Sequence, residues 1–180
     1  MDRRELESAA VTYAHMRGLL MLPAGALLVV SALANAGVIP TWAFPLALAP
    51  AGLAGLVILR HYRTHYGRVT HASQAKDAAA VAVAAVTVIA SAVLLGDLPV
   101  NTIAIGFGLG MLAAAAITPG LRVHHAAVWG GLALVGAVPL WNGPDPENVG
   151  LVLAGAAVAI CGLLDHRAFT DRFGPLDARA

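Results

Sequence analysis

Residues 78–96 read AAAVAVAAVTVIASAVLLG, a run without a charged side chain, and this stretch decides the class of fold. A helix of about 20 apolar residues is long enough to cross the hydrocarbon core of a bilayer. The whole chain of 180 residues has the same character, because 59% of its residues are hydrophobic and only 12% are charged. A soluble chain this short cannot bury so much apolar surface. The sequence therefore predicts an all-α, polytopic transmembrane bundle.

Five further apolar runs flank this one, and prolines and glycines separate them. The predicted membrane spans are residues 19–38, 41–59, 78–96, 100–118, 126–141 and 149–164. The last two runs are short and need flanking residues near the interface, so a re-entrant hairpin is the alternative for this pair. Before them, residues 1–18 are expected to form an amphipathic helix on the membrane surface. Residues 165–180 are expected to form a cytoplasmic tail.

The distribution of charge predicts the orientation of these spans. Every Lys and Arg falls on one side of the membrane, together with all seven histidines, whereas the other side carries only Asp97, Asp145 and Glu147. Because loops rich in Lys and Arg are retained in the cytoplasm, both termini are expected there. Removal of the first run as a signal peptide is the alternative, since Ala34-Asn35-Ala36 resembles a cleavage site.

The predicted spans hold no Asp, Glu, Lys, Arg or His in their middle. This argues against an ion- or proton-coupled pump, an intramembrane protease with a histidine base and a haem bound within the bundle. Polar residues such as Asn35 and Asn101 are interpreted as hydrogen-bonding partners between helices. A transport site for a neutral or lipidic molecule at these asparagines and the proline-broken helices is the alternative.

Small residues predict that the helices pack closely. Gly106 and Gly110 form a G-x-x-x-G pair, which lets two helices approach each other. Gly52, Gly55 and the pair Gly130-Gly131 are interpreted in the same way. These faces can pack within one chain or between the chains of a homo-oligomer, and the sequence leaves both alternatives open.

The second span ends in Arg60-His61-Tyr62-Arg63-Thr64-His65-Tyr66-Gly67-Arg68, the most unusual stretch of the chain. In a helix that continues to Tyr66, His61 and His65 share one face, as do Tyr62 and Tyr66. The two tyrosines are expected to be aromatic anchors at the membrane interface. The histidines can hold a metal completed by His71, His124 or His125. Because no neighbouring Glu or Cys supports such a site, the sequence predicts neither a metal nor a cofactor.

Two further interpretations of this side are binding of anionic lipid headgroups and docking of a cytosolic regulatory protein. A purely topological anchor, without any other role, is the plainest alternative. The leading hypothesis is a non-enzymatic regulatory or accessory protein of the inner membrane that binds such a lipid or partner. Its candidate contact residues are Arg60, His61, Arg63, His65, Tyr66, Arg68, Arg122, His124, His125, His166 and Arg167. An enzyme with a metal or general base among these histidines is the alternative.

Direct binding of nucleic acid is not expected, because the formal net charge is only +1. Residues 169–176 match residues 62–69 in the pattern aromatic-x-x-x-aromatic-Gly-x-aliphatic. The match predicts either duplicated helical hairpins or a common way of ending a membrane helix.

The stretch His61–Val69, together with Leu163-Leu164-Asp165-His166-Arg167, resembles a group of uncharacterised bacterial multipass membrane proteins. Members carry Tyr-Tyr-x-x-x-Tyr/Phe-Gly-x-Val after an early span and Leu-x-Asp-His after the last one. In this chain His61 replaces the first aromatic residue of the pattern. Genes of the group often neighbour one for a winged-helix transcriptional regulator. The resemblance implies a regulatory or accessory membrane role and brings no catalytic residue.

Overall fold

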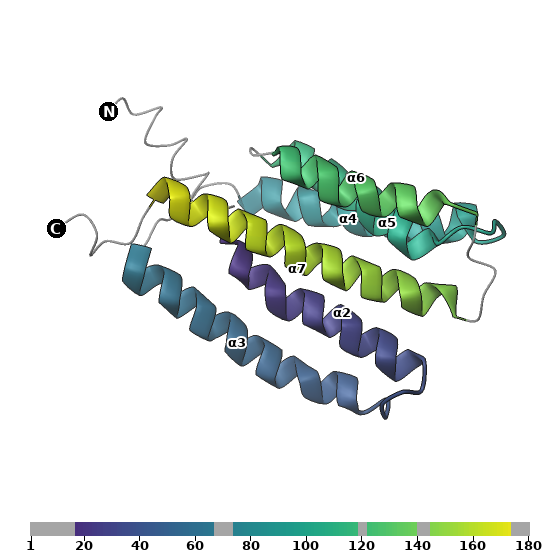
Figure 1. Cartoon of the computed structure of the whole chain (residues 1–180), viewed down its shortest axis with the longest axis horizontal. Coiled ribbons are helices and arrows are strands. Elements are labelled where there is room, and N and C mark those ends of the chain that lie inside the picture. Colours follow the sequence, from purple (N-terminus) through teal and green to yellow (C-terminus); the bar gives the residue numbers. More distant parts are fainter. Residues whose placement is uncertain (1–16, 67–73, 119–121, 140–144, 174–180) are drawn as a thin grey trace.

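The computed structural model describes residues 17–66, 74–118, 122–139 and 145–173, and these residues form helices and short connections without any strand. A single 3₁₀ turn, η1, precedes six α-helices that run in alternating directions (Figure 1). The predicted all-α bundle is therefore confirmed. The elements are η1 (Gly18–Leu20), α2 (Met21–Asn35), α3 (Ala43–Tyr66), α4 (Gln74–Leu95), α5 (Thr102–Ile117), α6 (Val123–Ala137) and α7 (Pro146–Phe173).

Four of the helical segments are long and apolar enough to cross a membrane, as judged by length and composition. They are Gly18–Asn35, Ala43–Tyr66, Ala75–Leu95 and Pro146–Arg172, whereas α5 and α6 are shorter apolar helices. The length and apolar composition of these helices are consistent with a membrane protein. The last helix is longer than expected, because it continues through residues 165–173 of the predicted tail. The amphipathic helix predicted for residues 1–18 lies almost wholly outside the described residues.

Helix α7 lies between two groups of helices (Figure 1). Along one side it packs against α2, which in turn packs against α3, and on the other side it contacts α5 and α6. Helix α4 packs against α5. The main hydrophobic core forms where α5, α6 and α7 meet, and it consists of Ala104, Trp129, Leu132, Ala154, Ala157, Val158 and Cys161.

Glycines set how closely these helices approach. A methyl group added at Gly155 of α7 would lie 2.7 Å from the carbonyl oxygen of Gly25 in α2, so the two backbones touch. The close packing predicted at Gly106 and Gly110 is confirmed, because methyl groups there would lie 2.8 and 2.9 Å from backbone atoms of α4. The Gly25–Gly155 contact between α2 and α7 was not predicted. Both contacts are of the kind that small residues allow between membrane helices.

The same interpretation is wrong within this chain for four other glycines. No atom lies within 4 Å of a methyl group added at Gly52 or Gly55 of α3, or at Gly130 or Gly131 of α6. These positions face the outside of the bundle. Glycine spacing alone does not distinguish an inward face from an outward one.

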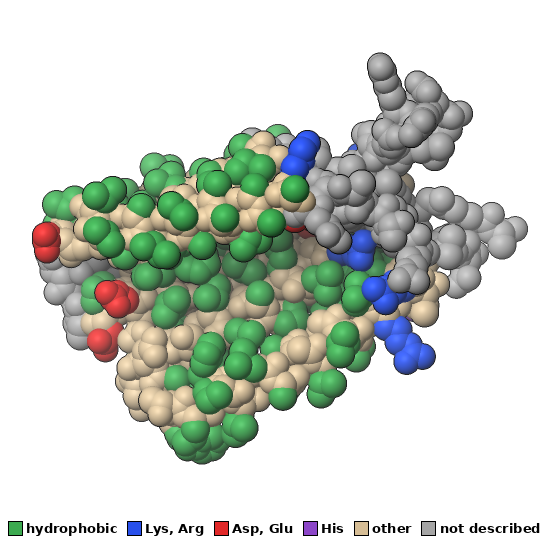
Figure 2. All heavy atoms as spheres, turned by 180° about the vertical axis from the view of Figure 1, so that it is seen from behind, with side chains coloured by type: hydrophobic (Ala, Val, Ile, Leu, Met, Phe, Trp, Pro, Cys, Tyr) green, Lys and Arg blue, Asp and Glu red, His purple; other side chains and the backbone are tan. Residues whose placement is uncertain are grey.

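The two ends of the bundle carry opposite charges (Figure 2). We call one the acidic end, where Asp97, Asp145 and Glu147 lie, and the other the basic end. The described cations at the basic end are Arg17, Arg60, Arg63, Lys76, Arg122, Arg167 and Arg172. Between the ends the surface is apolar, with Leu56 of α3 64% exposed and Val93 of α4 76% exposed. Such a belt of exposed apolar side chains is suited to contact with lipid.

Candidate functional site at the basic end

Asp165 of α7 is the centre of the candidate site, and its side chain is only 1% exposed. Its Oδ1 accepts hydrogen bonds from Arg122 Nη1 and from His124 Nε2, the latter at 2.9 Å. His125 Nε2 lies 3.1 Å from each of the two carboxylate oxygens. A buried carboxylate is strongly unfavourable unless it is paired with cations or hydrogen-bond donors. Arg122, which directly precedes α6, and His124 and His125 in its first turn provide this pairing.

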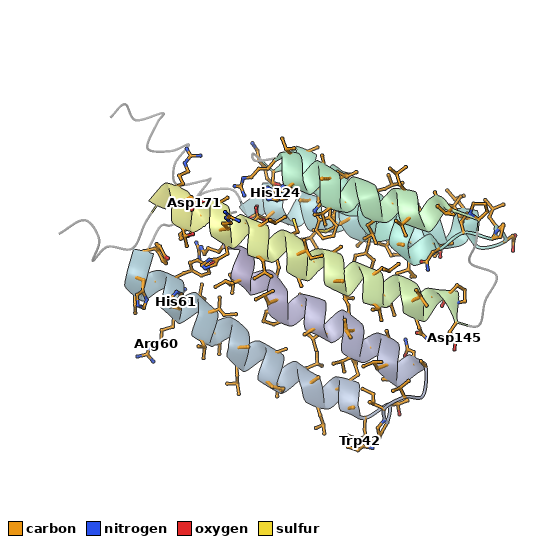
Figure 3. All side chains as sticks on the ribbon, viewed as in Figure 1. Trp42, Arg60, His61, His124, Asp145 and Asp171 are labelled. Atoms are coloured by element: carbon orange, nitrogen blue, oxygen red, sulfur yellow. The ribbon has the colours of Figure 1, made fainter. Side chains whose placement is uncertain are left out.

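The local structure of α6 explains how they reach Asp165. Arg122 is extended, with φ −109° and ψ 160°, and the helix begins at the next residue. The first turn of α6 lies beside α7, and His124 in this turn contacts Asp165 of α7 (Figure 3). The backbone N–H of Arg122 donates a long hydrogen bond of 3.4 Å to His125 Nδ1. This contact makes Nδ1 the acceptor, so that Nε2 of the neutral ring carries the proton donated to Asp165.

Cys161 lies one helical turn before Asp165, on the same face of α7. Its side chain is fully buried in the main core, where it packs with Trp129. One ligand atom each from His124, His125, Cys161 and Asp165 lies within 4.8 Å of the other three. A cavity of about 120 Å³ adjoins the cluster, and its lining includes Arg122, His125, Cys161 and Asp165. The cluster thus has the donor atoms and the adjoining space that a metal ion needs.

The neighbouring residue, His166, faces the opposite half of the bundle. The Tyr62 hydroxyl of α3 forms a hydrogen bond of 2.8 Å with His166 Nδ1 and accepts a long one from the Leu19 N–H at 3.4 Å. The Tyr62 ring packs edge-on against Phe169 with centroids 5.2 Å apart, and the Tyr66 ring does so at 4.7 Å. Tyr62 is fully buried. The prediction that it is an interfacial anchor is therefore wrong.

The sequence match between residues 62–69 and 169–176 falls on two helices that contact each other. The matched helices α3 and α7 run in the same direction, and their aromatic residues pack against each other at the basic end. Gly67 and Gly174, the glycines of the motif, lie outside the described residues.

The predicted contact residues divide into two groups. Arg60 points away from the bundle (Figure 3), and His61, Arg63 and His65 are likewise exposed at the end of α3. The shared face predicted for His61 and His65 is confirmed by ring centroids 4.4 Å apart. Arg167 of α7 is exposed too. The second group is engaged inside the bundle, and it consists of Arg122, His124, His125, His166 and Tyr66.

Two members of the candidate site were missed by sequence analysis, namely Asp165 and Cys161. Asp165 was assigned to the cytoplasmic tail because the apolar run ends at Leu164, and no role was assigned to Cys161. Their i, i+4 spacing was the available signal, because it places both side chains on one face of a helix. A metal site completing the His61–His65 pair is not formed by the part of the chain that the structure describes. His71 and Arg68 lie outside that part.

Asn101 has a structural role at the acidic end. Its side-chain oxygen accepts from the Ala104 N–H at 2.9 Å and caps α5, while its amide donates to the Pro146 carbonyl at 2.6 Å. The side chain is buried and joins α5 to the start of α7. The predicted role in helix–helix hydrogen bonding is confirmed for this residue.

Comparison of the chain with protein-family models, with curated proteins and with solved structures finds no match. The resemblance to bacterial multipass proteins accordingly stays a prediction. Function has to be inferred from the chemistry of the two groups of residues at the basic end.

Proposed function

We propose that the chain is a non-enzymatic accessory protein of a bacterial inner membrane whose basic end binds anionic lipid headgroups. The observation that carries this proposal is the gathering of exposed cations from three helices at one end of the bundle. We call these residues the basic rim, and they are Arg60 and Arg63 of α3, Lys76 of α4 and Arg167 of α7.

The basic rim has the chemistry that an anionic membrane surface attracts. A Lys or Arg near such a surface contributes about 1 kcal/mol of attraction. The arginine guanidinium also donates two parallel hydrogen bonds to a phosphate, which fixes the headgroup in place. The exposed imidazoles of His61 and His65 lie in the same last turns of α3 and add further donors.

The asymmetry of charge supports an orientation with both termini in the cytoplasm. Positive residues are retained on the cytoplasmic side, where the leaflet surface is negative. The acidic end, with Asp97, Asp145 and Glu147, would then face the periplasm.

Reporter fusions test the orientation. Alkaline phosphatase fused after Arg68 or at the C-terminus should be inactive, and a fusion near Gly143 should be active. The reverse pattern would place the basic rim on the periplasmic side and contradict the proposal.

Native mass spectrometry of the purified protein in detergent tests lipid binding. The wild-type chain should retain phosphatidylglycerol in preference to phosphatidylcholine with the same acyl chains. The variant R60Q/R63Q/R167Q should lose this preference, by about fivefold for each cation removed. As a matched control, D145N/E147Q changes charges only at the acidic end and should bind like the wild type.

Equal binding of both lipids by the wild type, or an unchanged preference in the rim variant, would refute lipid binding at the basic rim. Crosslinking in cells addresses the competing role of this surface. A soluble protein crosslinked to the wild type but not to R60Q/R63Q/R167Q, without any lipid preference, would assign the rim to protein docking instead.

A further inference from the structure

We infer that His124, His125, Cys161 and Asp165 bind one Zn²⁺ ion, which joins the start of α6 to α7. The inference is independent of lipid binding, because none of the four residues belongs to the basic rim. Two imidazoles, one thiolate and one carboxylate are all ligands that Zn²⁺ uses in proteins. Their mixture of nitrogen, sulfur and oxygen suits this borderline-soft ion better than Mg²⁺ or Ca²⁺, which prefer oxygen alone.

The positions of the ligand atoms lie close to what zinc requires. Zinc–ligand bonds of about 2.0–2.3 Å in a tetrahedron place neighbouring ligand atoms about 3.5 Å apart. In the structure the corresponding atoms all lie within 4.8 Å of one another. The site therefore forms by a contraction of about 1 Å at its widest point, which rotations of the two imidazole rings can supply. The adjoining cavity of about 120 Å³ provides space for the ion beside His125, Cys161 and Asp165.

The buried negative charge of the site can be compensated both with and without the ion. Without metal, the guanidinium of Arg122 compensates the buried carboxylate of Asp165. With metal, the Cys161 thiol releases its proton to solvent, and thiolate and carboxylate together balance the charge of Zn²⁺. Arg122 is then no longer needed at this place. Its side chain is 20% exposed at the end of the bundle, and it turns outward to solvent or headgroups.

Proton positions change as well. When Nε2 of each imidazole binds the metal, the protons that His124 and His125 now donate to Asp165 move to Nδ1 of the same rings. In His125 the long contact from the Arg122 N–H is thereby lost. Metal and Arg122 therefore compete for the same carboxylate. Removing the arginine should strengthen metal binding, which is the opposite of what loss of a supporting residue would do.

The coordination predicts a structural site rather than a catalytic one. Catalytic zinc sites have three protein ligands and an open position for water, whereas four protein ligands close the coordination sphere. Helices α6 and α7 supply two ligands each, so the ion crosslinks them at the basic end.

Cobalt spectroscopy tests the site directly. The protein is purified in detergent without a polyhistidine tag, stripped with a chelator and titrated with Co²⁺. The wild type should bind one Co²⁺ per chain with the absorption of a tetrahedral site and a thiolate-to-cobalt charge-transfer band, and Zn²⁺ should displace it. The chain contains one cysteine, so this band reports Cys161 without any substitution.

Variants then identify the ligands. C161S should lose the charge-transfer band and bind Zn²⁺ at least about tenfold more weakly, since even outer-shell partners of a metal contribute about that much. R122M should bind Zn²⁺ more tightly than the wild type. The matched control H61A/H65A removes the exposed histidine pair of α3 and should leave binding unchanged. Absence of a thiolate band in the wild type, or weaker Zn²⁺ binding in R122M, would overturn the inference.

Discussion

Asp165 and His166 are neighbours in α7, yet they face opposite halves of the bundle and meet opposite chemistry. On the α6 side, a buried carboxylate is held by a guanidinium and two imidazoles. On the α2–α3 side, the contacts are a tyrosine–histidine hydrogen bond, aromatic edges and the touching backbones of Gly25 and Gly155. Besides the hydrophobic core that it shares with α5 and α6, α7 thus has a buried ionic contact on one side and close backbone and aromatic packing on the other.

The two kinds of contact should respond differently to the loss of one member. A buried ion that loses its partner keeps its full desolvation cost. The loss of stability is therefore large, and its size depends on whether the ion itself is still present. Packing contacts and neutral hydrogen bonds contribute smaller, more nearly additive amounts. The comparison can therefore be tested by removing single members on each side of α7.

The largest effect is expected for R122M in metal-free protein. Asp165 then loses its cation while remaining buried, and we expect the free energy of unfolding in mixed detergent–SDS micelles to fall by about 3 kcal/mol. The double variant R122M/D165L replaces the ion pair with apolar side chains and should recover most of this loss. A double variant less stable than R122M would show that the ion pair itself is net stabilising.

Contacts on both sides of α7 were missed by sequence analysis. Apolar runs predicted the existence of all six helices, because hydrophobicity is local information. The inward position of Tyr62 and the Gly25–Gly155 contact depend on partners distant in the chain, so no local sequence pattern predicts them. On the α6 side, the distribution of charged residues and histidines correctly predicted that Arg122, His124 and His125 lie at the basic end.

Asp165 was misjudged for a related reason. The apolar run stops at Leu164, but a helix continues as long as its polar side chains find partners, and both Asp165 and His166 have them. One sequence shows where hydrophobicity ends and does not show where the helix ends.

A smaller effect is expected for G155A on the packing side of α7. The added methyl group meets the backbone of Gly25 at 2.7 Å, where no flexible side chain can give way. We expect a loss of about 1–2 kcal/mol in the same unfolding assay. The control G52A places a methyl group in open space on a helix and should be neutral or stabilising by up to about 1 kcal/mol. Equal shifts in both variants would mean that α2 and α7 are not in close contact.

The smallest effect is expected for Y62F, which removes only the hydroxyl and leaves the aromatic packing on Phe169 in place. Loss of the hydrogen bond to His166 should lower the free energy of unfolding by about 1 kcal/mol. A double-mutant cycle with H166A isolates this bond, because its coupling energy excludes the other contacts of each residue. We expect a coupling of about 1 kcal/mol for Tyr62 with His166 and a clearly larger one for Arg122 with Asp165 in metal-free protein, measured with R122M, D165L and their combination. If the Tyr62–His166 coupling equals or exceeds the ionic one, the two sides of α7 do not differ in the way that their chemistry indicates.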